Sequence, residues 1–190
     1  MKIVSKILIP FLLIIAVVGT GYSQKHHQNK KPIKKKEKNV KAHKHQPHHH
    51  KHYAHLPKKG FVSAKPKGAM LVVHSGHNYH FHQGVWYKPH QDKFIVFRPH
   101  AGLRVKLLPP KHHICIVRKR TYYYYYGTYY SKVEGTDEYE VIDVPIGAQV
   151  SEIPSDYQLK DVDGIEHYIV DDVHYIYHVD TEMYEVVSVE

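Results

Sequence analysis

One pattern of strands and turns occurs three times between Pro66 and Glu190, and this repeat limits the folds that the chain can adopt. When the copies are aligned on a proline, their turn residues and aromatic residues fall at matching positions. The prolines are Pro66, Pro109 and Pro154, the middle-turn residues are Gly84, Gly127 and Asp172, and the pairs that follow are Trp86-Tyr87, Tyr129-Tyr130 and His174-Tyr175. Self-similarity with a period of about 40–50 residues indicates tandem structural units.

Each copy predicts four short strands joined by tight turns. In the first copy the expected strands are 69–73, 77–82, 85–88 and 93–98. The X-Gly pairs between them, such as Gln83-Gly84, favour two-residue hairpins, because glycine adopts the positive φ of these turns. Tyrosine runs favour strands over helices. The predicted fold class is all-β, with three tandem four-stranded β-meander repeats that form small stacked or paired antiparallel sheets after a disordered tail.

The predicted hairpins also fix which residues lie opposite each other. The expected cross-strand pairs are Phe81 with Trp86, Tyr124 with Tyr129, and Ile169 with His174, each contributing about 0.2–1 kcal/mol. The connectors 99–108 and 144–153 share several apolar positions. We expect each of them to add one further strand or extended crossing.

The N-terminus predicts export. A basic start, an apolar run over 7–19 and the small residues Gly21 and Ser23 are typical of a cleaved signal peptide. We expect a periplasmic, envelope or secreted protein with no transmembrane span after cleavage. The predicted segments are a signal peptide (1–23), a disordered His/Lys-rich tail (24–59) and β-repeats at 60–108, 109–153 and 154–190.

Charge divides the chain after the predicted signal peptide. Residues 24–120 contain 23 Lys or Arg and two acids, a net charge of +21, whereas residues 121–190 contain two Lys and 16 acids, a net charge of −14. The tail up to about residue 59 has too little apolar surface to offset its ordering entropy, so we expect it to be disordered. The asymmetry suggests an arm that binds polyanions, or self-association between the basic and acidic halves.

A resemblance to a known family rests on the second copy. Its Tyr122–Tyr126 run, Gly127 and Tyr129-Tyr130, followed by Tyr139–Ile142 and Pro145–Ala148, resemble an uncharacterised family of exported bacterial proteins with tandem Tyr/Gly-rich repeats. The third copy departs from that pattern at Asp172 and His174. The resemblance implies an envelope or secreted location and no particular activity.

Histidine is the main candidate for metal chemistry, because the chain contains 20. The tail candidates are His43, His45, His48, His49, His50, His52 and His55. Neutral imidazoles bind Zn, Cu and Ni, although the interleaved lysines oppose a dication. A second candidate is His80 with His82, two residues apart on one strand face, where neither Val85 nor Tyr87 offers a third ligand; a structural role is the alternative for this pair.

The aromatic residues have two interpretations. They are structural, or some of them form an exposed platform that binds a glycan or a protein. The platform candidates are Trp86, Tyr87, Tyr123, Tyr125, Tyr129 and Tyr130. The single cysteine, Cys115, lies in an apolar strand and is expected to pack in the core, with an intermolecular disulfide as the alternative.

Lysines of the tail are candidates for contact with polyanions. They are Lys34, Lys35, Lys36, Lys38 and Lys41. Such clusters neutralise phosphates without reading sequence, so the expected partners are an envelope polymer or protein, an anionic glycan or a nucleic acid. A solubilising arm is the alternative.

The sequence contains none of the usual enzyme motifs, such as a nucleophile elbow, a phosphate-binding loop or a His-Glu-x-x-His pair. The acids Asp161, Asp163, Asp171 and Asp172 fall in predicted turns, where aspartate is favoured for turn geometry. We therefore expect an exported, non-enzymatic β-repeat protein that acts in adhesion, scaffolding or binding, with a polycationic arm for anionic surfaces. The alternative is a metal-sequestering protein that binds Zn, Cu or Ni through the tail.

Overall fold

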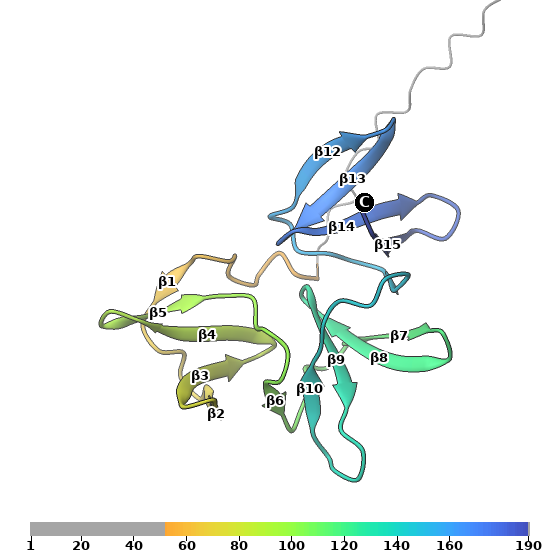
Figure 1. Cartoon of the computed structure of the whole chain (residues 1–190). Helices are drawn as coiled ribbons and strands as arrows, with labels where there is room; N and C mark the ends of the chain where they lie inside the picture. Colours follow the sequence, from red (N-terminus) through yellow and green to blue (C-terminus); the bar gives the residue numbers. More distant parts are fainter. Residues whose placement is uncertain (1–51, 190) are drawn as a thin grey trace, which may run out of the picture. The chain divides into compact units, whose positions relative to one another are not determined.

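The structure, a computed structural model, describes residues 52–189, and these residues form three antiparallel five-stranded sheets without a helix. The first sheet contains β1 (Val62–Ser63), β2 (Met70–His74), β3 (His77–His82), β4 (Val85–His90) and β5 (Lys93–Val96). The second contains β6 (Arg104–Val105), β7 (His113–Val117), β8 (Arg120–Tyr125), β9 (Thr128–Lys132) and β10 (Tyr139–Val141). The third contains β11 (Gln149–Val150), β12 (Gln158–Val162), β13 (Ile165–Val170), β14 (Val173–His178) and β15 (Met183–Val187) (Figure 1). The all-β prediction is confirmed.

The middle hairpin of each sheet turns through two residues with positive φ. These pairs are Gln83-Gly84, Tyr126-Gly127 and Asp171-Asp172. Positive φ at both central positions matches the twist of the flanking strands. Asp172 occupies the glycine position of the third copy with φ of 66°, because aspartate tolerates the left-handed region better than most residues.

The register confirms the predicted cross-strand pairs. Phe81 lies opposite Trp86, Tyr124 opposite Tyr129, and Ile169 opposite His174. The ring centroids of the first pair are 5.0 Å apart and those of the second 4.8 Å apart. The aromatic runs therefore form the expected hairpins.

The sheets have five strands rather than the predicted four. The short strands β1, β6 and β11 each pair with the last strand of a sheet, and β6 and β11 come from the two connectors. The closing strand β10 has backbone groups to satisfy on its outer side, and the connector supplies partners: Gly102 N–H donates to Val141 O at 2.9 Å, and Val141 N–H donates to Leu103 O at 2.8 Å. Each connector strand thus pairs within the sheet that follows it, whereas the boundaries drawn from the sequence put it in the preceding repeat.

The end of the predicted disordered tail is ordered. Residues 52–59 form turns, and the side chains of Tyr53 and Leu56 are buried. The Tyr53 ring lies 5.4 Å from that of Tyr125 and 5.3 Å from that of Tyr126. The few apolar residues here lack a periodic pattern because they contact another part of the chain rather than form a regular element.

One face of each of the first two sheets packs against the next sheet. Val72, Phe81 and Trp86 of the first sheet share a core with Val105, Tyr130 and Val141 of the second. The residues of the second sheet at the equivalent repeat positions are Cys115, Tyr124 and Tyr129. They share a core with Val150, Tyr175 and Val186 of the third sheet. Aromatic side chains in the two middle hairpins therefore hold three small sheets in one unit.

The corresponding face of the third sheet is different in composition. Lys160, Ile169 and His174 occupy the positions that are apolar or aromatic in the first two sheets, and none of the three is fully buried. This face therefore lacks the aromatic residues through which the first and second sheets contact the sheet that follows. We call this surface the terminal face.

Among residues 52–189, no helix has the length and apolar character needed to span a membrane. The predicted signal peptide and most of the predicted tail lie outside the described residues.

Candidate functional site

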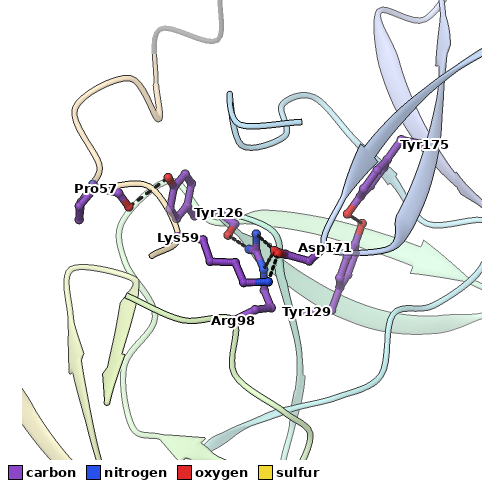
Figure 2. A network of polar contacts seen from close by, with 7 residues as sticks. All are labelled: Pro57, Lys59, Arg98, Tyr126, Tyr129, Asp171 and Tyr175. Atoms are coloured by element: carbon purple, nitrogen blue, oxygen red, sulfur yellow. Dashed lines mark hydrogen bonds and ion pairs between the residues drawn. The ribbon is translucent and has the colours of Figure 1, made fainter. Parts of the chain in front are cut away.

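Two basic side chains from distant parts of the chain meet at Asp171. Arg98, which follows β5, places Nε 2.6 Å and Nη2 2.5 Å from Asp171 Oδ2, and the Lys59 ammonium pairs with Oδ1 of the same carboxylate. Figure 2 shows both basic side chains directed at Asp171. A turn of the third sheet is thereby fixed to the first sheet and to residues 52–59, which we call the N-terminal segment.

Arg98 also contacts the second sheet. Its Nη1 donates to the carbonyl oxygen of Tyr126 at 2.5 Å (Figure 2). An added Cβ at Gly127 would collide with the Arg98 guanidinium, so glycine at this position leaves room for the arginine. One guanidinium therefore connects the middle turns of the second and third sheets.

The charge of Asp171 is stabilised despite its burial. Its side chain is 16% exposed and that of Arg98 is 21% exposed. Burial alone would raise the pKa of Asp171, but the charges and hydrogen bonds of Arg98 and Lys59 outweigh it and hold the pKa below its ordinary value. The carboxylate is ionised at neutral pH and is held by two cations, so it is poorly suited to act as a general base.

The last residues of the predicted tail complete this junction. The Tyr126 hydroxyl donates to Pro57 O at 3.2 Å (Figure 2), and Tyr53 and Leu56 belong to the same core as Tyr125 and Tyr126. A cavity of about 10 Å³ lies beside Lys59, Arg98 and Tyr126, enough for about one water molecule. We call Lys59, Arg98, Asp171 and Tyr126 the junction; its geometry suits structural support rather than binding of a substrate.

A larger hollow of about 620 Å³ opens next to the N-terminal segment. Apolar side chains including Phe81, Leu107 and Tyr125 line it, and His52 and His55 contribute polar edges. A concave, mainly apolar hollow with a few polar groups is the usual form of a small-ligand site. Two of the histidines predicted as metal ligands thus border one hollow.

A family comparison assigns the chain. A model described as "Family of unknown function (DUF6515)" matches residues 21–190. The chain belongs to this family. No curated protein and no solved structure matches it. Membership of DUF6515 confirms the resemblance to an uncharacterised family and assigns no activity.

The residues predicted as an aromatic binding platform are mostly in the core of this DUF6515 chain. Trp86, Tyr87, Tyr125, Tyr129 and Tyr130 are each at most 5% exposed, and Tyr123 is half-buried against the second core cluster. Neighbouring sheets cover both faces of the central hairpin, so alternation along the strand does not bring these rings to the surface. The structural interpretation of the aromatic residues fits this arrangement.

His80 and His82 lie on one face of β3, opposite Tyr87 and Val85 as expected. His80 is 5% exposed and packs edge-on against Phe94 at 4.8 Å between ring centroids. Burial, assisted by the charge of Lys65, lowers the pKa of His80. Within residues 52–189 no group of three or more His, Cys, Asp or Glu side chains is arranged to hold a metal ion, so this pair has no third protein ligand there.

The remaining predicted sites fall outside the described residues. These are the histidines His43, His45, His48, His49 and His50 and the lysines Lys34, Lys35, Lys36, Lys38 and Lys41. Cys115, in contrast, is described, and it is buried in the core as predicted.

The sequence pattern did not predict two arrangements, the pairing of Asp171 with Arg98 and that of His167 with His174. Asp171 was interpreted as a turn residue, and its partner Arg98 lies 73 positions away. His167 and His174 meet across β13 and β14 with their Nδ1 atoms 3.1 Å apart. The sequence does contain an indication of the histidine pair, because both histidines stand where the second copy has tyrosines (Tyr122 and Tyr129).

Proposed function

We propose that this chain is an exported, non-enzymatic binding protein of the cell envelope or exterior, in which the three sheets act as a scaffold and the basic N-terminal arm (residues 24–51) binds. The observation that carries this proposal is the attachment of residues 52–59, which directly follow the arm. Tyr53 and Leu56 are buried in the core, and Lys59 pairs with Asp171 of the third sheet. The scaffold thus holds the residues next to the arm in place.

The use of the aromatic residues favours a scaffold over an adhesive aromatic surface. Because Trp86, Tyr129 and Tyr130 are buried in contacts between sheets, they are not available to stack on a glycan. The binding element must then be sought in the charged parts of the chain. Residues 24–51 contain ten lysines and one acid.

The ligand that suits such an arm is an anionic envelope polymer, rich in phosphate or carboxylate. Lysines that neutralise phosphates release condensed counterions, so binding weakens steeply as salt concentration rises. The described residues up to 120 extend the basic character, with 13 Lys or Arg against one acid. The acidic third sheet would repel the same polymer, so binding is expected to depend on the basic part of the chain.

The test is binding of the mature chain (residues 24–190) to an immobilised anionic polysaccharide at about 50 and 200 mM salt. Replacing Lys34, Lys35, Lys36, Lys38 and Lys41 by Gln is expected to weaken binding and flatten its salt dependence. The matched control replaces five exposed scaffold lysines, Lys67, Lys93, Lys106, Lys111 and Lys119, and so changes the net charge equally. Equal losses in both variants would show that overall charge, and not the arm, binds. Retention of binding by the arm variant would contradict the proposal.

Metal sequestration by the arm together with the adjoining His52 and His55 is the second candidate, supported by the position of these two histidines at one hollow. Titration of the mature chain with Zn²⁺, Cu²⁺ and Ni²⁺ separates the two functions. Tight uptake that disappears when the arm histidines are replaced by Gln, together with salt-insensitive or absent polymer binding, would favour sequestration. Self-association is excluded or detected by sedimentation in the same buffers.

A further inference from the structure

Two histidines meet on the terminal face of the third sheet. His167 of β13 and His174 of β14 place their Nδ1 atoms 3.1 Å apart, with ring centroids 5.2 Å apart and ring planes inclined by 75°. They are diagonal neighbours across the hairpin, since His167 lies opposite Ile176 and His174 opposite Ile169. His167 is 6% exposed and His174 is half-buried, so the two nitrogens meet in a partly covered position.

The spacing of the two nitrogens suits one metal ion. Zn²⁺ binds imidazole nitrogen at about 2.0–2.1 Å in tetrahedral geometry, which puts two such nitrogens about 3.3 Å apart. The observed 3.1 Å is close to this value. Both rings lie on a paired hairpin rather than a loop, so the backbone of β13 and β14 already positions them.

We propose that His167 and His174 form a two-histidine site for a divalent transition metal of the Zn²⁺, Cu²⁺ or Ni²⁺ type. Both Nδ1 lone pairs would bind the ion. As for His80 and His82, no third His, Cys, Asp or Glu of the described residues is placed to bind it, so water would complete its coordination. In the metal-free protein one Nδ1–H donates to the other Nδ1, so on binding that proton moves to Nε2 of its own ring. Imidazole nitrogen is a preferred ligand of all three ions.

The charged groups near the two histidines have opposing effects on the pKa of His174 and on a bound cation. Burial, together with His167 and Lys160, lowers the pKa of His174, whereas Asp172 acts in the opposite sense. Lys160 lies directly opposite His167 on β12, and its ammonium opposes a bound dication. His178, which lies on β14 with His174, is paired with Glu185, and its Nε2 lies 2.8 Å from Glu185 Oε2.

The test uses the mature chain with the seven arm histidines outside the described residues replaced by Gln: His26, His27, His43, His45, His48, His49 and His50. Zn²⁺ and Cu²⁺ are titrated calorimetrically at pH 7.5, and ¹⁵N NMR of the imidazoles follows the Zn²⁺ titration. One ion per chain is expected, with Nδ1 of His167 and of His174 shifting together. Binding is expected to weaken as the pH falls below about 6, because protons compete for the nitrogens.

Single substitutions distinguish this site from others in the chain. His167→Gln or His174→Gln should each weaken binding at least about tenfold, whereas the matched control His178→Gln should not. Lys160→Gln removes the opposing charge and should tighten binding, a gain that a destabilised fold could not produce. Unchanged affinity in His174→Gln, or a Zn²⁺ response confined to other imidazoles, would overturn the assignment. The outcome does not depend on polymer binding by the arm.

Discussion

Trp86 of the first sheet donates its indole N–H to the hydroxyl of Tyr130 in the second sheet at 2.9 Å, and both side chains are almost fully buried. The same relation recurs one repeat later, where the Tyr129 hydroxyl donates to Tyr175 at 3.5 Å. The sheets are thus joined by equivalent positions of successive copies. In the third copy this position holds His174, which pairs with His167 instead.

Replacement of Trp86 by Phe should lower the free energy of unfolding by about 2 kcal/mol, because it removes one donor to a buried hydroxyl and leaves part of the indole volume unfilled. Tyr129→Phe is the comparison, since the longer contact that it removes should cost less than about 1 kcal/mol. Urea unfolding followed by circular dichroism measures both. A larger loss in Tyr129→Phe than in Trp86→Phe would contradict this ranking.

Replacement of Asp171 by Asn should destabilise the protein by about 3 kcal/mol at pH 7, because it leaves Arg98 partly buried without its charge partner. Lys59 is 53% exposed, so Lys59→Ala should cost only about 0.5 kcal/mol. Asp171→Asn removes both ion pairs and Lys59→Ala removes only one, so the difference between their unfolding free energies measures the contribution of Arg98. Equal losses would assign the stabilisation to Lys59 and contradict this prediction.

The pH dependence of stability should also depend on Asp171. Its pKa in the folded protein is lower than its ordinary value, so its contribution is fully present above about pH 4, the unfolded-state pKa. That contribution is lost as the pH falls through the folded-state pKa. Asp171→Asn should therefore show a smaller loss of stability between about pH 4 and pH 2 than the unmodified chain. Parallel profiles would mean that another carboxylate is responsible.

Two glycines with similar φ angles should respond differently to alanine. Gly127 (φ 77°) faces the Arg98 guanidinium, whereas Gly135 (φ 73°) has nothing within 4 Å of an added Cβ. Gly135→Ala should cost only the backbone strain, about 1 kcal/mol, and Gly127→Ala should cost about 1–2 kcal/mol more because the arginine is displaced. The additional cost should shrink in the Arg98→Ala background, which a double-mutant cycle measures.

Cys115 should be unreactive in the folded protein. It is 5% exposed, and burial raises its pKa to about 11, so at pH 8 about one thiol in a thousand is ionised. Alkylation by iodoacetamide at pH 8 should therefore be slow, rise as the pH approaches 11, and become fast in urea. Rapid labelling without denaturant, or a disulfide-linked dimer in the untreated protein, would contradict a core position.

The sequence predicted the hairpins well because their determinants are local. Turn glycines such as Gly84 and Gly127 fix where each strand reverses, and the period of two then sets pairs such as Phe81 with Trp86. The contacts between sheets were beyond this reasoning. In the run Tyr122–Tyr126 alternate residues are identical in type, so the pattern cannot say which face meets a neighbour. Nor does any local signal link Arg98 to Asp171.

The candidate sites were less predictable for the same reason. The platform residues Trp86 and Tyr130 were singled out by type, and burial by a neighbouring sheet depends on contacts across 44 positions. His167 and His174 were individually visible, but their meeting depends on the register of β13 with β14. Comparison of the third copy with the second, position by position, would have drawn attention to them.

The terminal face lacks the aromatic surface on which a further sheet could pack as the second and third sheets pack on their predecessors. A fourth copy placed after the third would have to pack on Lys160, Ile169 and His174 instead of on the aromatic surface that receives each earlier copy. Simple duplication of the coding segment would therefore produce an unsupported unit rather than a longer array. To add a further copy, an engineer would first have to restore aromatic residues at these positions of the third copy.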